Sequence, residues 1–341
     1  MLNTLTEEEF FSGLYQVVHP STPVAHSQGL CGRQREWRLL EQALSAPGRH
    51  ALVYGAAGIG KTSLAHTLVA HHRLRCPPVK ISCDPDSTLL SLMKHALTLG
   101  DSGLSRRHES VFCARFSLAG SGVKFEKKVV EQQCAAAIED NATVVTALEA
   151  WGERLQSPVW LIIDDLDRMA RMEERRGFLT LFKQLADRAC PVKIILVARG
   201  EQPEGVFGAG EAFTRHLSPV KLAPLTLKNG YKFISLCLAS FGLLMVERLK
   251  WRVAQACAGH PRKLHQVCER LLISAWERGG RHITPQQCQY ALQSVRCEGP
   301  APAGAGGTTR HNRGTHPWLV QKTFRHRTRP YEAQATIPFS R

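Results

Sequence analysis

The chain opens with a stretch in which polar and apolar residues follow the period of a helix. Thr6-Glu7-Glu8-Glu9 is typical of a capping box, and apolar residues from Phe10 to Val17 recur at helical spacing behind it, which predicts a short leader helix. The segment His19 to Gly29 has two prolines and no apolar period, as linkers do. We therefore assign residues 1–29 to a leader helix and linker, and we expect the folded core to begin near Leu30.

From residue 30 to residue 225, short apolar runs alternate with segments of helical period. The runs predicted as strands are Ala51 to Tyr54, Val79 to Cys83, Val159 to Ile163, Val192 to Ala198 and Val220 to Leu222. The predicted helices are Arg35 to Ala46, Lys61 to His71, Ser87 to Leu99, Val144 to Leu155 and Glu174 to Arg188. Such alternation predicts an α/β fold, with a parallel sheet sandwiched between helices. The pattern loosens over residues 100–140, which we interpret as an insertion.

After residue 225 the pattern is helical only. Apolar residues at helical spacing predict three helices, around Phe233 to Phe241, Leu264 to Ala275 and Cys288 to Val295. We assign residues 226–297 to a small all-helical subdomain. Residues 298–341 are basic and show no sustained period, so we expect this tail to be disordered.

Composition narrows the class of protein. The 341 residues include 44 Lys and Arg against 29 Asp and Glu, a net charge of +15 that attracts polyanions such as double-stranded DNA. The longest uncharged apolar stretch, Phe233 to Val246, is shorter than the roughly 18 residues of a membrane span, and no secretory signal opens the chain. The 11 cysteines form no CxxC pair and are expected to be reduced. We expect a cytoplasmic protein without a membrane partner.

One glycine-rich segment carries a phosphate-binding pattern. Gly55-Ala56-Ala57-Gly58-Ile59-Gly60-Lys61-Thr62 fits GxxxxGK(S/T) in full, between a predicted strand and a predicted helix. In that context backbone N–H groups from Gly55 to Ser63 would surround the phosphates, Lys61 would contact the β- and γ-phosphates, and Thr62 would bind Mg²⁺. The alternative is a glycine-rich turn without a ligand.

A second strand ends in acidic residues. Asp164-Asp165-Leu166-Asp167 follows the apolar run Val159 to Ile163, and ligands bind at the carboxyl ends of parallel strands. Asp164 is then the candidate Walker-B acid that holds Mg²⁺, and Asp165 the candidate that orients the attacking water. The alternative is that the three acids only cap the next helix.

Together these motifs resemble the AAA+ superfamily, and more closely the branch shared by origin-recognition-like ATPases, transposition-helper ATPases and STAND signalling ATPases. Gly32-Arg33-Gln34-Arg35-Glu36 is similar to the GRxxE box of that branch, and the resemblance implies that Gly32 and Arg33 border the adenine. Gly259-His260-Pro261-Arg262 is similar to the GxPR of the AAA+ lid, which implies that Arg262 reaches the γ-phosphate. A local salt bridge of Arg262 is the alternative.

The chain departs from the family pattern at three places. Asp165 stands where members with rapid turnover have Glu, and its shorter side chain implies slow hydrolysis. The strand ending at Ala198 lacks a polar sensor, so Arg199 is a candidate for that role. Arg215 lies where some relatives place an arginine finger for a neighbouring subunit, or it is an ordinary surface arginine.

The leading hypothesis is therefore a Mg²⁺-dependent ATPase. It would use ATP binding and slow hydrolysis to switch conformation or assembly in a DNA transaction, as a nucleotide-dependent homo-oligomer or with a protein partner. One alternative is a STAND-like signalling or defence switch acting on a protein partner. Another is a nucleotide-binding protein that has lost turnover.

Overall fold

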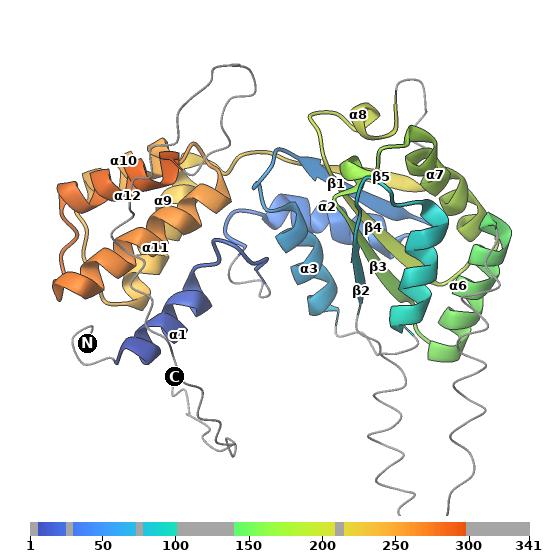
Figure 1. Ribbon diagram of the computed structural model, residues 1–341, viewed down its shortest axis with the longest axis horizontal. Helices are drawn as coiled ribbons and strands as arrows, with labels where there is room; N and C mark the ends of the chain where they lie inside the picture. The colour runs from blue at the N-terminus through green and yellow to red at the C-terminus, as the bar shows by residue number, and fades with distance from the viewer. Residues whose placement is uncertain (1–5, 25–29, 73–77, 101–139, 209–214, 298–341) are drawn as a thin grey trace, which may run out of the picture. The chain divides into compact units, whose positions relative to one another are not determined.

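Five parallel strands form one sheet in the described part of the chain. The computed structural model describes residues 6–24, 30–72, 78–100, 140–208 and 215–297. Within them the sheet has the order β2-β3-β4-β1-β5 (Figure 1). The strands are β1 (His50–Gly55), β2 (Val79–Ser82), β3 (Val159–Asp164), β4 (Val192–Arg199) and β5 (Leu217–Leu222). The five predicted strands are confirmed, and β5 begins at Leu217 rather than at Val220.

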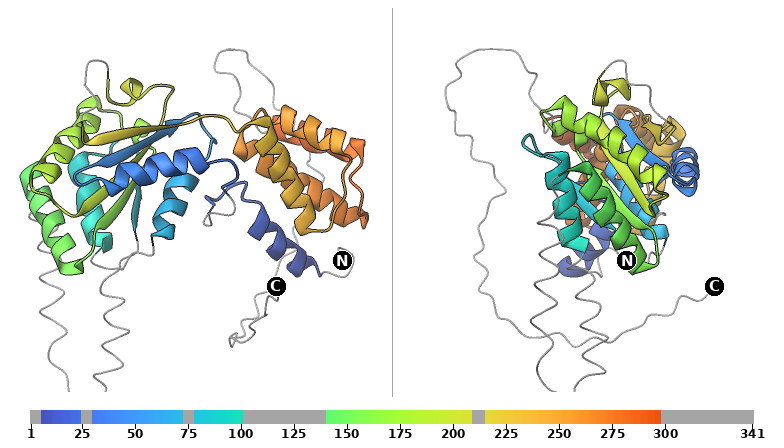
Figure 2. Two further views of the ribbon diagram at one scale, coloured as in Figure 1. Left: turned by 180° about the vertical axis from the view of Figure 1, so that it is seen from behind. Right: turned by 90° about the vertical axis from the view of Figure 1, so that its right-hand side faces the viewer.

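Helices cover both faces of the sheet, as the alternating pattern predicts (Figure 2). Because successive side chains of a strand point to opposite faces, Leu52 packs in one core and Val53 in the other. The Val53 core contains side chains of α2 and α3, and the Leu52 core contains those of α6, α7 and the helix over residues 89–100. The bounds are α2 (Gln34–Ser45), α3 (Lys61–His71), α6 (Asn141–Leu155), η3 (Leu166–Arg168), α7 (Met172–Asp187) and α8 (Glu204–Phe207). This arrangement confirms the predicted α/β sandwich.

In the described residues after the sheet there are four helices, one more than predicted. They are α9 (Leu227–Ser240), α10 (Glu247–Ala256), α11 (Pro261–Arg278) and α12 (Pro285–Cys297). The unpredicted helix is α10, whose fully buried residues are Val253 and Ala254. Leu249 also packs against the core, one turn before Val253, so the sequence does contain a short apolar stripe for this helix. The α9–α12 helices share a core of their own.

The leader helix α1 (Glu7–Val17) belongs to that same core. Its predicted capping box is present, with the Glu9 amide donating to the Thr6 hydroxyl. Phe10 and Leu14 are fully buried, and the Phe10 ring stacks on Trp276 of α11 with centroids 4.9 Å apart. The prediction that the folded core begins near Leu30 is therefore wrong. The hydrophobic stripe of α1 was visible in the sequence, but its partner lies more than two hundred residues away.

Three other expectations concern the cysteines, the absence of a membrane span, and two segments outside the described residues. The seven cysteines whose side chains the structure describes are free thiols, all buried except the partly exposed Cys31. Within those ranges, no helix combines the length and the apolar character needed to cross a bilayer. Nearly all of the predicted insertion and the whole basic tail fall outside the described part of the chain.

Candidate nucleotide site

The glycine-rich segment forms a loop between β1 and α3, as predicted. Gly60 precedes α3 with a φ of 94°, in the left-handed region that favours glycine. Gly55 at the end of β1 has a φ of 148°, and a Cβ there would lie 2.6 Å from the carbonyl oxygen of Leu222. Glycine at these two positions allows the backbone to turn so that the loop amides lie at the N-terminus of α3. That is the arrangement of an anion-binding loop.

Lys61 lies at the start of α3 and folds back over this loop. Its Nζ donates hydrogen bonds to the carbonyl oxygens of Gly55 at 3.0 Å and of Ala56 at 2.8 Å. The residue is buried, and desolvation lowers the pKa of its ammonium, while the carboxylate of Asp167 opposes that shift. The loop carbonyls thus hold the ammonium beside the phosphate-binding amides.

Asp164 at the end of β3 meets the first turn of α3. Its Oδ1 accepts hydrogen bonds from Thr62 Oγ1 at 3.1 Å and from the Asp165 amide at 3.0 Å. Its Oδ2 pairs with Lys80 Nζ at 3.0 Å. A hydroxyl and a carboxylate in contact are hard oxygen donors of the kind that Mg²⁺ prefers, so this donor set fits the metal.

Asp165 lines the same pocket and has an unusual backbone conformation. Its φ of 55° is left-handed, which is uncommon for a residue with a side chain, and its carboxylate is partly exposed. Neither η3 nor α7 has a side-chain cap at its N-terminus. The structure therefore does not support the alternative that these acids only cap the next helix. Asp167 instead accepts a 2.7 Å hydrogen bond from the Arg199 amide.

The candidate arginines occupy different places. Arg262 is the second residue of α11, and its backbone amide donates to the Gly58 carbonyl oxygen at 3.3 Å. Among the described residues, its guanidinium has no ion-pair partner, against the alternative of a local salt bridge. Arg199, at the end of β4 between β1 and β3, lines the pocket with Arg262. Arg215 is exposed and lies outside the lining of this pocket, and its carbonyl oxygen accepts from Arg49 Nε at 3.1 Å.

The segment that resembles the GRxxE box contacts the phosphate-binding loop through Arg33. Arg33 is buried, and its guanidinium donates to the carbonyl oxygens of Ile59 at 2.9 Å and of Ala223 at 2.7 Å. Burial lowers the pKa of Arg33, and Glu36, 3.0 Å away, opposes that shift. Gly32 has a φ of 75° and is so close to Asn229 that a Cβ would lie 2.2 Å from the amide nitrogen. Arg33 lines the pocket, whereas Gly32 is not part of its lining.

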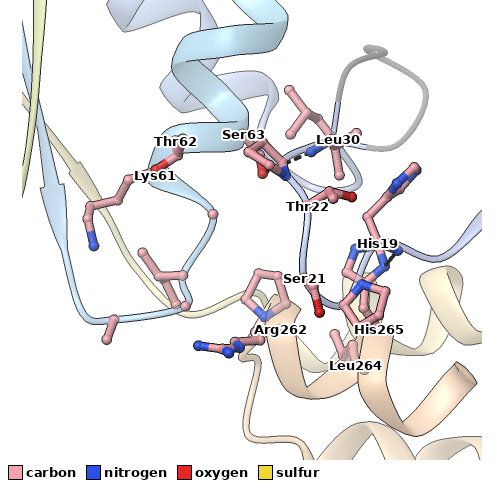
Figure 3. Close-up of a pocket in the computed structure, with 18 of the residues that line it drawn as sticks. His19, Ser21, Thr22, Leu30, Lys61, Thr62, Ser63, Arg262, Leu264 and His265 are labelled. Atoms are coloured by element: carbon pink, nitrogen blue, oxygen red, sulfur yellow. Dashed lines mark hydrogen bonds between the residues drawn. The ribbon is translucent and has the colours of Figure 1, made fainter. Parts of the chain in front are cut away.

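The pocket has a volume of about 460 Å³ and includes residues that the motifs did not reveal (Figure 3). The segment from His19 to Val24, predicted as a linker, forms part of its wall. It is tied to α3, since the Val24 amide donates to Ser63 Oγ at 3.1 Å and Thr67 Oγ1 donates to the Val24 carbonyl at 2.8 Å. The other unpredicted lining residues include Lys80, Phe233, Leu264 and His265. A short prolyl segment without a period gives no sequence signal for such a role.

Comparison with known proteins agrees with this architecture. Residues 29–197 match the family model described as AAA ATPase domain. The Walker-type ATPase paby2304 of Pyrococcus abyssi aligns with a TM-score of 0.55 at 18% identity, over 81% of this chain and 75% of that chain. None of the curated proteins matches the sequence.

Two further solved structures align less closely. The RuvB Holliday junction branch migration motor of Thermotoga maritima has a TM-score of 0.46 at 12% identity, over 79% of this chain and 72% of that chain. Domain III of the Thermotoga maritima replication initiation protein DnaA has a TM-score of 0.45 at 16% identity, over 77% and 92% of the two chains.

The parallel sheet, the phosphate-binding loop after β1 and the acidic end of β3 define a P-loop nucleotide-binding ATPase. The family match over residues 29–197 identifies this part of the chain as an AAA ATPase domain. The predicted fold class and the predicted ATPase activity are thereby confirmed.

Proposed function

We propose that this ATPase binds ATP with Mg²⁺, hydrolyses it slowly, and uses the nucleotide state to switch conformation or assembly in a DNA transaction. The observation that carries the proposal is the 3.1 Å contact between Thr62 Oγ1 and Asp164 Oδ1. It joins the phosphate-binding helix to the acidic strand end, and this pairing of hydroxyl and carboxylate is the usual Mg²⁺ support of P-loop ATPases.

The residues around this contact divide the chemistry between them. The loop amides and the N-terminus of α3 bind the phosphates, and Lys61 Nζ exchanges its two loop carbonyls for β- and γ-phosphate oxygens. Asp165 orients a water for attack on the γ-phosphate. When held by Thr62 and Asp164, Mg²⁺ would supply positive charge at those phosphate oxygens. The short side chain of Asp165 accounts for slow turnover.

The helices after the sheet would carry the switch. Arg262, the second residue of α11, lines the pocket and its amide donates to the Gly58 carbonyl, which supports a contact of its guanidinium with a γ-phosphate. A side chain that contacts ATP but not ADP gives the two states different free energies, which is what a nucleotide switch requires. The exposed Arg215 is the candidate to act on a neighbouring copy, which supports ATP-dependent assembly.

The DNA part of the proposal rests on charge. The net charge of +15 gives a general attraction for polyanions, and the release of counterions makes such binding salt-dependent. A STAND-like switch acting on a protein partner is the second candidate. It is favoured by Asp165, because the STAND ATPases that the chain resembles more often have Asp than Glu at this position.

The test is hydrolysis of Mg²⁺-ATP by the full chain, with and without double-stranded DNA, at two salt concentrations. Lys61→Ala serves as the control for contaminating activity. Stimulation by DNA that is lost in the variant and weakened by salt would support the proposal. Turnover indifferent to DNA would favour the protein-partnered switch, and activity equal to that of Lys61→Ala would exclude hydrolysis at this site.

A further inference from the structure

Lys80 is a charged residue of the pocket that the proposed chemistry does not use. It lies on β2, and its Nζ is 3.0 Å from Oδ2 of Asp164. The carboxylate is almost completely buried, with 7% of its side chain exposed, while the lysine side chain is 30% exposed. Lys80 also lines the same pocket as Lys61 and Thr62. An ammonium ion is therefore paired with the Walker-B acid inside the nucleotide site.

The sheet register explains how Lys80 reaches this position. Strands β2 and β3 are parallel, with Ser82 opposite Asp164, and Lys80 lies two residues before Ser82 on the same face of β2. The alternate residues Val79 and Ile81 are buried in the sheet core. A lysine on this face has a side chain long enough to extend along the strand to the acidic end of β3.

The two oxygens of Asp164 have different partners. Oδ1 accepts from the Thr62 hydroxyl and the Asp165 amide, whereas Oδ2 pairs with Lys80. Across the described ranges, Lys80 is the basic residue in ion-pair contact with this carboxylate. The same two charges act on nearby His66 of α3. Burial and Lys80 lower the pKa of its imidazole, and Asp164 opposes that shift. The carboxylate is thus neutralised by a cation that the chain itself supplies.

We propose that Lys80 is a resident counter-ion of Asp164 that lowers the preference of this site for Mg²⁺-loaded over metal-free nucleotide. The inference rests on the proposed nucleotide site and deepens it. The ammonium attracts the phosphates of metal-free ATP, whose charge no metal reduces. It also opposes a second cation beside the same carboxylate, since like charges repel at short range. Both effects change the ratio of the two affinities in the same direction.

The experiment measures equilibrium binding of ATP to the full chain by calorimetry, once in Mg²⁺ and once in EDTA. The quantity compared is the Kd in EDTA divided by the Kd in Mg²⁺. In Lys80→Met this ratio should rise about tenfold, the scale of one charge interaction in a partly exposed site. Lys80→Arg keeps the charge and should keep the wild-type ratio. Lys221→Met is the matched control, because Lys221 pairs with the exposed Glu201 outside the pocket lining.

The outcomes separate this inference from the proposed function. A ratio in Lys80→Met that equals the wild-type ratio, or falls below it, overturns the counter-ion role while leaving the nucleotide site intact. A ratio that rises equally in Lys80→Arg also overturns it, because charge would then not be the cause. If the wild-type protein binds ATP no better than Lys61→Ala, the proposed nucleotide site is wrong, and this inference is wrong as well. Because the ratio compares two states of the same variant, a uniform loss of folded protein does not alter it.

Discussion

The backbone amide of His19 donates a 2.9 Å hydrogen bond to Nδ1 of His265, which lies 246 residues later in the chain. An imidazole nitrogen that accepts a hydrogen bond carries no proton, so the ring is neutral with its proton on Nε2. Burial, with a smaller contribution from His19, lowers the pKa of His265 to about 4. This contact joins the leader segment to α11 at the wall of the nucleotide pocket (Figure 3).

The first prediction concerns stability in acid. His265 titrates at about 4 in the folded chain and near 6.5 when unfolded, so the unfolded state binds more protons between these values. The free energy of unfolding should therefore fall as the pH drops from 6.5 to 4. His50, whose pKa burial lowers to about 3, adds to the same trend.

Urea unfolding at pH 7, 6 and 5 measures this slope. His265→Gln removes one of these titrations and should reduce the slope by about 1.4 kcal/mol per pH unit at most. The exposed His95→Gln is the control and should keep the wild-type slope. An unchanged slope in His265→Gln would mean that His265 is not held neutral.

The leader helix should contribute directly to stability. Phe10 is fully buried against Trp276 and Phe241, with ring centroids 4.9 and 5.5 Å away. Phe10→Ala should lower the free energy of unfolding by about 3 kcal/mol, the range for a buried aromatic truncation. Tyr15→Ala on the exposed side of α1 should cost well under half of that. Equal losses in the two variants would contradict the packing of α1 into this core.

Arg262 should distinguish ATP from ADP. A guanidinium hydrogen-bonded to the γ-phosphate is worth roughly 1.5 to 3 kcal/mol, so Arg262→Ala should weaken ATP binding about tenfold or more and leave ADP binding nearly unchanged. Lys263→Ala removes the same charge from the next residue of α11 and should alter neither affinity. Calorimetric titration of both nucleotides tests this, and an equal loss for ATP and ADP would exclude a γ-phosphate contact.

Asp165 should affect turnover more than binding. Asp165→Asn keeps the size of the side chain but removes its charge, and it should lower the hydrolysis rate by about 10² or more, as loss of a general base does. ATP affinity should change little, because Asp164 and Lys61 remain. Asp165→Glu reaches further toward the water and should raise the rate. A rate in Asp165→Asn equal to that of the wild type would show that another residue orients the water.

Much of the α/β part could be predicted because its signals are local. A parallel strand buried on both faces must be continuously apolar, so β1 and β3 stand out in the sequence. The phosphate loop is equally local, since Gly55, Gly60 and Lys61 must follow one another for a loop to precede α3. The early start of β5 was missed because Ser218 and Pro219 interrupt its apolar pattern. The helix α10 carries only a short apolar stripe, Leu249 and Val253, which the sequence prediction did not use.

What the sequence by itself determined is the chemistry of each segment: a loop for phosphate, an acidic strand end, a basic chain and an amphipathic leader. The tertiary structure alone decided which of these segments meet. The register of β2 against β3 brings Lys80 to Asp164, and the packing of α1 on α11 brings His19 to His265. Such contacts join residues far apart in the chain, and they depend on three-dimensional packing that no local pattern of residues encodes.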